Sequence, residues 1–129
     1  MSLLIDEYRK VWSIRYLRES RADLVKAEEI PIPDVSVNFA LVSMKKAQTA
    51  LYYSLGDPEH LAFVVKEAME EGEGTKDPLM LLLIQIEWLI HTRHDMAESL
   101  RKEVIVEDAK QILNVASDIV DLMVGRSVR

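Results

Sequence analysis

Apolar residues recur at intervals of three and four along most of this chain, and this spacing predicts α-helices. The clearest stripe lies between Val106 and Val124, where the opposite face carries charged side chains. No stretch alternates apolar and polar residues in the manner of a strand. The pattern predicts four main helices and one shorter helix. The main ones span residues 4–29, 35–55, 78–100 and 106–124, and the shorter one spans residues 58–70.

Proline and glycine mark the breaks between these segments. Asp57 and Asp77 each precede a proline, so each offers a capping carboxylate to a helix with proline at its first position. Asp34 and Ser36 are the candidate caps after the first break, and residues 101–105 are expected to form a loop. Short connections favour an all-α fold, an antiparallel up-down four-helix bundle with an extra short helix after Gly56, in a single domain over residues 1–129.

Composition narrows the possible classes of function. The chain has 129 residues and no cysteine, which excludes a disulfide scaffold, a thiolate metal site and a cysteine nucleophile. Its net charge of −6 argues against a basic nucleic-acid binder. The apolar run over residues 79–90 would span about 18 Å as a helix, too short for a ~30 Å hydrocarbon core. We therefore expect a cytoplasmic protein that does not enter the membrane.

The same run, residues 79–90, is apolar nearly all round. A helix in a small bundle has one face to bury, so a second apolar face predicts contact with another chain. We expect a homodimer formed through the segments over residues 78–100 and 106–124.

The densest polar group follows this run. Glu87, His91, Asp95 and Glu98 lie at spacings of four, four and three, which predicts a shared helix face, and His94 lies four residues before Glu98. Imidazole and carboxylate suit zinc, manganese or iron. One helix rarely completes a coordination sphere, and no second cluster exists, so we assign no metal and no cofactor. Whether Glu87, His91 and Asp95 bind a metal stays open.

Two carboxylate pairs suggest an alternative chemistry. Glu67 and Glu70, with Asp95 and Glu98, resemble the paired acids of the all-α nucleoside triphosphate pyrophosphatases, which hold Mg²⁺. Here the second pair has the reverse order, and Asp95 lies about 25 Å from the start of its helix. The spacing therefore predicts that the two pairs lie far apart.

The first helix carries basic residues near Trp12 and Tyr16, which is one pattern of nucleic-acid binding. Acidic residues are interleaved with them, as on a solvated helix face, so nucleic-acid binding is possible but not favoured. The basic residues are Arg9, Lys10, Arg15, Arg18 and Arg21.

Several segments in order resemble the HEPN domain family. The sequence Trp88-Leu-Ile-His-Thr-Arg93-His94 and the later Ala109, Ile112 and Ala116 are similar to its C-terminal half. Residues 16–27, residues 47–56 and the pair His60-Leu61 are similar to its first half. The resemblance covers most of the chain and implies a helical bundle that pairs with a second copy.

In the active branch of that family, an Arg and a later His meet at a dimer interface and cleave RNA without metal. Arg93 and His94 match the first two positions, but Glu98, Ser99 and Leu100 occupy the window of the second His. The resemblance therefore implies a non-catalytic member, a partner or substrate-binding subunit of a nucleotidyltransferase or toxin–antitoxin type system. Its contact surface would be Arg93, His94, Asp95 and Glu98.

Three alternatives stay open. Arg93 and His94 are the catalytic candidates if the protein is a metal-independent ribonuclease. The other two alternatives are a metal-dependent nucleotide pyrophosphohydrolase and a helical adaptor without a ligand.

Overall fold

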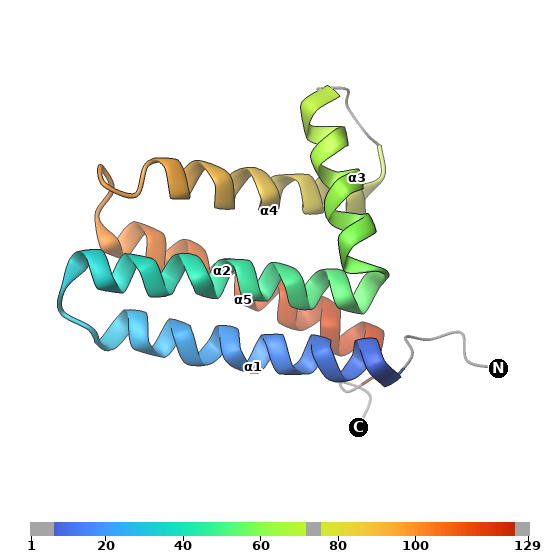
Figure 1. The fold of residues 1–129 in the computed structure, drawn as a ribbon, viewed down its shortest axis with the longest axis horizontal. Helices are drawn as coiled ribbons and strands as arrows, with labels where there is room; N and C mark the ends of the chain where they lie inside the picture. The colour runs from blue at the N-terminus through green and yellow to red at the C-terminus, as the bar shows by residue number, and fades with distance from the viewer. Residues whose placement is uncertain (1–6, 72–75, 126–129) are drawn as a thin grey trace.

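The computed structural model describes residues 7–71 and 76–125, which fold into five α-helices and no strand (Figure 1). The helices are α1 (Glu7–Glu29), α2 (Pro33–Leu55), α3 (Pro58–Glu71), α4 (Pro78–Asp95) and α5 (Lys102–Val124). The all-α prediction is confirmed, and α3 is the short helix expected after Gly56. The expected helix start at residue 4 and residues 72–75 of the third break lie outside the described residues.

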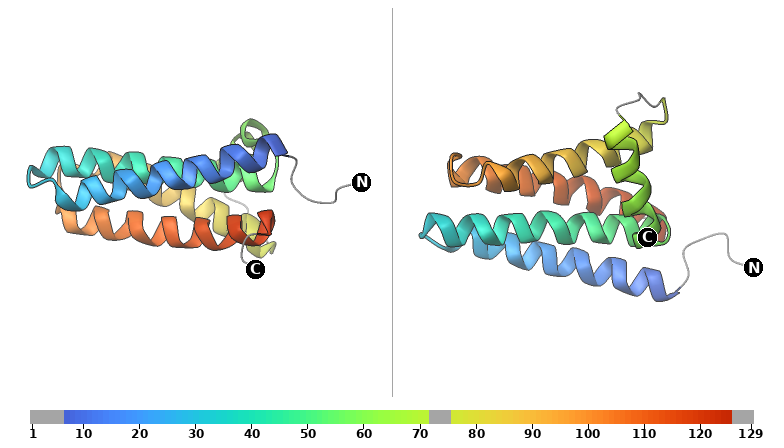
Figure 2. Two further views of the ribbon diagram at one scale, coloured as in Figure 1. Left: turned by 90° about the horizontal axis from the view of Figure 1, so that it is seen from below. Right: turned by 45° about the horizontal axis from the view of Figure 1, so that its top comes forward.

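Helix α2 is central to the arrangement (Figures 1 and 2). It lies beside α1, packs against α5 along much of its length, and also contacts α3 and α4. Helix α3 crosses the end of α2 at a steep angle and leads into α4, which returns along the bundle on the side away from α1. No described helix is both long and apolar enough to span a bilayer.

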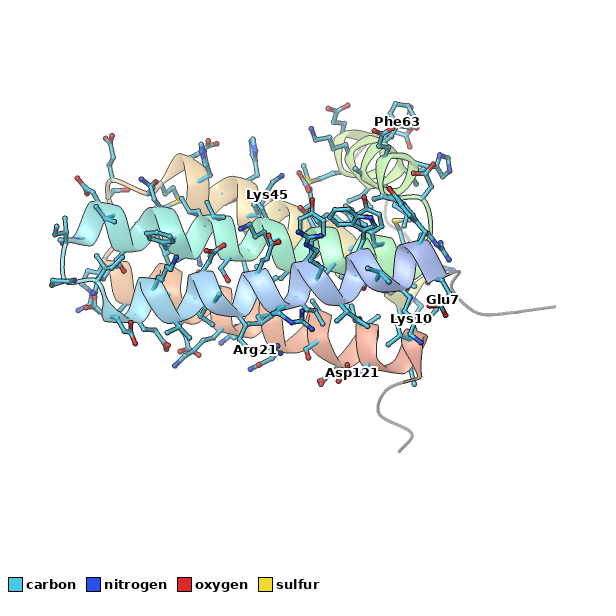
Figure 3. All side chains as sticks on the ribbon, turned by 60° about the horizontal axis from the view of Figure 1, so that its bottom comes forward. Glu7, Lys10, Arg21, Lys45, Phe63 and Asp121 are labelled. Carbon is cyan, nitrogen blue, oxygen red and sulfur yellow. The ribbon has the colours of Figure 1, made fainter. Side chains whose placement is uncertain are left out.

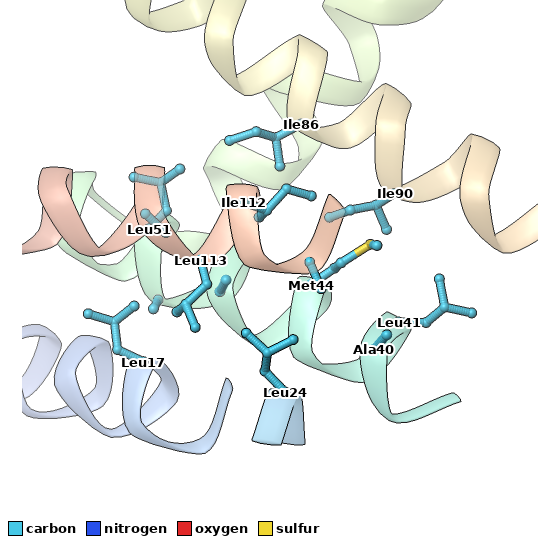
Figure 4. Packing of buried hydrophobic residues seen from close by; sticks show 14 of the residues in the cluster. Leu17, Leu24, Ala40, Leu41, Met44, Leu51, Ile86, Ile90, Ile112 and Leu113 are labelled. Atoms are coloured by element: carbon cyan, nitrogen blue, oxygen red, sulfur yellow. The ribbon is translucent and has the colours of Figure 1, made fainter. Parts of the chain in front are cut away.

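Small side chains let α1, α2 and α5 approach closely around one core. Met44 and Leu51 on α2 are fully buried, with α1 supplying Leu17 and Leu24 and α5 supplying residues of the predicted stripe (Figure 4). Alanines with no exposed surface lie on all three helices, and they are Ala27, Ala40, Ala47, Ala50, Ala109 and Ala116.

Buried serines join α1 to α2. The Ser20 hydroxyl lies 2.8 Å from the Ser43 carbonyl, and the Ser43 hydroxyl lies 2.8 Å from the Ser20 carbonyl. Ser13 donates to the carbonyl of Ala50 at 2.8 Å, and Ser36 donates to that of Ala27. These bonds satisfy polar groups inside the interface, so the serines face the core rather than solvent.

Three boundaries differ from the predictions. Helix α4 ends at Asp95 instead of residue 100, so Glu98 lies in a turn and does not share a helix face with Glu87. Helix α5 begins at Lys102, within the expected loop, because Ile105 is fully buried and extends the apolar stripe.

The third difference concerns the start of α2. Pro33 begins this helix and Ile32 is its N-cap residue, so neither Asp34 nor Ser36 is the cap. The Ser36 hydroxyl is used for the Ala27 carbonyl instead. The predicted caps Asp57 and Asp77 are confirmed, since their carboxylates accept from the backbone N–H groups of Glu59 and Leu79.

The packing predicts an asymmetric response to truncation. Met44→Ala removes a side chain with no exposed surface and should lower the free energy of unfolding by about 2–5 kcal/mol. Leu122→Ala, at a side chain 70% exposed, should change it by less than about 0.5 kcal/mol. Urea denaturation measures both. Equal losses would contradict the described core.

Candidate functional site

A groove of about 780 Å³ opens between α2, α3 and α4. Pockets for small organic ligands typically have about 300–1,000 Å³, so the groove has room for one. Its walls are the apolar side chains of Leu41, Ala62, Met69 and Ile90, and its polar members come from all three helices.

Helical spacing brings the lining residues together. On α2 they lie at positions 41, 45, 48 and 52, which form one face because they are three or four residues apart. On α4 they are Glu87, Ile90, His91 and His94, again one face. The steep crossing of α3 adds Lys66 and Glu70 from a third side (Figure 2).

Three polar side chains meet where α2 faces α4. Gln48 and Tyr52, on α2, are only 4% and 5% exposed. Gln48 donates through Nε2 to Glu87 Oε1 at 2.6 Å and to the Tyr52 hydroxyl oxygen at 3.2 Å. A carboxylate only accepts hydrogen bonds, so it fixes the amide with its NH₂ group toward Glu87. We call Gln48, Tyr52 and Glu87 the polar floor of the groove.

The Tyr52 hydroxyl stays protonated well into alkaline conditions. Burial raises its pKa above the ordinary value of 10, and the negative charge of Glu87 raises it further, while the bond from Gln48 acts in the opposite direction. A neutral phenol that accepts from Gln48 keeps its own proton for another acceptor. The floor therefore offers one donor, at Tyr52, beside one carboxylate acceptor, at Glu87.

Nitrogen donors surround the mouth of the groove. Lys45 on α2 and Lys66 on α3 are exposed, and Figure 3 marks Lys45 on its helix. His91 and His94 add imidazole N–H groups from α4, and Glu70 is the one carboxylate at this rim among the described lining residues. The two ammonium groups, with the imidazole nitrogens that are not turned toward Asp95, suit an anion such as a phosphate.

Of the four residues predicted to form the contact surface, His94 lines the groove and the other three do not. Arg93 Nε lies 2.5 Å from Asp108 Oδ2, an ion pair that joins α4 to α5, and both side chains are mostly buried. Asp95 is exposed and lies 3.5 Å from His91 and 3.9 Å from His94. Glu98 is exposed in the turn after α4.

The predicted acid pairs do not combine. Glu67 and Glu70 lie on α3, which adjoins the start of α4, whereas Asp95 is the last residue of α4 and Glu98 follows it. Within residues 7–71 and 76–125, no three His, Asp or Glu side chains are placed to hold a metal ion. The arrangement offers no support for a magnesium-dependent hydrolase.

The aromatic residues of α1 pack mainly on one another. Tyr53 of α2 stacks with Trp12 and Tyr16 at ring-centroid distances of 6.4 and 5.8 Å. The Arg15 guanidinium covers the Trp12 ring at 5.0 Å and pairs with Glu19. Because these rings and the Arg15 guanidinium contact one another, they favour a solvated helix face over a nucleic-acid binding surface.

Sequence reasoning missed most of the groove. The apolar stripe of α2 predicted its buried face but gave no reason to single out Lys45, Gln48 and Tyr52. Lys66 is one of several charged residues on α3. One feature of the sequence could have indicated the groove: Gln48 interrupts the apolar stripe between Met44 and Leu51. A polar residue at a buried position usually has a hydrogen-bond partner nearby.

Comparisons of the chain with protein-family models, with curated proteins and with solved structures found no match.

Tyr52 should show an alkaline signature. Its pKa is higher in the folded protein than the ordinary value of 10, so its stabilising contribution is complete below pH 10 and is lost as the pH rises above it. Absorbance at 295 nm against pH should show a late tyrosinate step that Tyr52→Phe removes. The same change at exposed Tyr8 should leave that step in place. Loss of the late step in Tyr8→Phe would contradict the assignment.

Proposed function

We propose that this protein is a non-catalytic, HEPN-like helical module that holds a nucleotide in the groove between α2, α3 and α4. It would act as the substrate-binding or partner subunit of a nucleotidyltransferase or toxin–antitoxin type system. In this proposal α1, α2, α4 and α5 correspond to the four helices of an up-down bundle. The carrying observation is a groove with a polar floor and a rim of nitrogen donors.

The dimensions of the groove support a nucleotide. Glu87 in the floor and His94 at the rim are seven residues apart on α4, which is about 10 Å along the helix axis. A base at the floor and a phosphate at the rim need a separation of this order. Leu41, Met69 and Ile90 supply apolar surface to the same groove.

The position of Arg93 supports a non-catalytic module. Its guanidinium is engaged by Asp108 in a mostly buried pair between α4 and α5, which gives it a structural role. The carboxylate of Glu98 follows in the window of the family's second His. In this interpretation Arg93 holds α4 on α5, and His94 is the predicted site residue that reaches the ligand.

Nucleotide binding is tested by calorimetry with AMP. The wild-type protein should bind AMP saturably, and Lys45→Ala combined with Lys66→Ala should weaken binding about tenfold or more by removing two phosphate contacts. The paired control is Arg21→Ala with Lys10→Ala, which removes the same charge from α1 and should leave the affinity unchanged. Absence of binding, or an equal loss in the control, would refute the proposal.

We also propose that α4 forms the homodimer contact. Its exposed side chains include Leu79, Leu81 and Trp88, on the apolar run that predicted a second chain. Trp88→Ser should shift the protein from dimer to monomer in sedimentation equilibrium, since a large aromatic side chain at an interface centre contributes most. Phe63→Ser, at an equally exposed ring on α3, is the control. A monomeric wild-type protein would rule out the dimer.

A further inference from the structure

We infer that the groove selects nucleotides by their base. The selected bases carry an exocyclic amino group next to a ring nitrogen that accepts a hydrogen bond, as adenine and cytosine do. It would reject the matching carbonyl bases, hypoxanthine and uracil. This inference rests on the proposed nucleotide site and adds the class of base. It is carried by the order of donor and acceptor in the polar floor, Gln48, Tyr52 and Glu87.

Glu87 supplies the acceptor. A carboxylate has two oxygens and no hydrogen to donate. One oxygen of Glu87 accepts from Gln48 at 2.6 Å, and no donor within residues 7–71 and 76–125 takes the other. An amino group can donate to that second oxygen. A carbonyl in the same place would set two acceptors against each other, close to a negative charge.

Tyr52 supplies the donor, and Gln48 fixes its direction. The Gln48 amide already donates to Glu87, and its NH₂ group also reaches the Tyr52 oxygen at 3.2 Å. The phenol oxygen is therefore an acceptor toward Gln48, so its O–H points elsewhere. Tyr52 is itself one of the residues that line the groove, so an O–H turned away from Gln48 can donate to a group bound there. Gln48 thus acts as a positioning residue.

The resulting pattern matches one class of base edge. Adenine presents an amino group beside the unprotonated ring nitrogen N1, and cytosine presents one beside N3, so each offers a donor next to an acceptor. Glu87 would accept from the amino group while Tyr52 donates to the ring nitrogen. Hypoxanthine and uracil present the reverse order, a carbonyl beside a ring N–H, and in the same orientation, fixed by the phosphate at the rim, they leave both floor groups unpaired. Such a mismatch typically costs about tenfold or more in affinity.

The experiment compares nucleotides that differ at this edge alone. Calorimetry of the wild-type protein should give an affinity for AMP about tenfold or more above that for IMP, and for CMP above UMP. Glu87→Gln keeps the shape but replaces the carboxylate with an amide that can donate or accept, so the AMP/IMP ratio should fall toward one. Tyr52→Phe should lower the ratio as well.

A matched control separates the floor from the rim. Lys45→Ala should lower the affinities for AMP and IMP by the same factor and leave the ratio of the two affinities unchanged. The reason is that Lys45 is assigned to the phosphate and not to the base. Equal binding of AMP and IMP by the wild type, or a preference for IMP, overturns the inference and leaves the proposed nucleotide site standing. Failure of all four nucleotides to bind overturns both. A ratio that persists in Glu87→Gln overturns the role assigned to Glu87.

Discussion

The close contact between α1 and α2 is the constraint on which the rest of this structure depends. Alanines and serines at the interface let the two backbones approach, and the reciprocal bonds of Ser20 and Ser43 satisfy the polar atoms that this approach buries. The remaining apolar surface of α2 is then covered by α5. These two contacts make α2 the central helix, and its last free face is left for α3 and α4.

That last face explains why a groove exists at all. Helix α3 crosses the end of α2 steeply, so α4 starts away from the core and returns along the bundle, contacting α2 and α3 (Figure 1). The Arg93–Asp108 pair then ties the far end of α4 to α5. Gln48 and Glu87 meet where the middle of α4 contacts α2, and the groove opens beside this contact, between α2, α3 and α4.

The sequence predicted the helices well and the groove poorly, for a physical reason. Helical periodicity reports which face of a segment is apolar, so the stripe through Ala109, Ile112 and Ala116 was correct. It does not report how far apart two helices lie. The periodicity was least accurate at the ends of helices. Burial of Ile105 accompanies an earlier start of α5 than predicted, and α4 ends at Asp95, so Glu98 lies outside the helix. Lys45 and Lys66 are far apart in sequence, and the steep crossing of α3 brings both to the lining of one groove.

The polar floor has an energetic implication for function. Gln48 and Tyr52 occupy positions that an apolar side chain would fill at lower desolvation cost, and burying a carboxylate beside them adds to that cost. Hydrogen bonds among the three offset part of it, but the Tyr52 proton and the second Glu87 oxygen gain no partner within the described chain. The Gln48–Glu87 bond also joins α4 to α2, so the polar floor has a structural role as well. A ligand that supplies the missing acceptor and donor together would turn this cost into binding energy. In the proposed function, these unused hydrogen-bonding groups of Tyr52 and Glu87 are the ones that recognise the base.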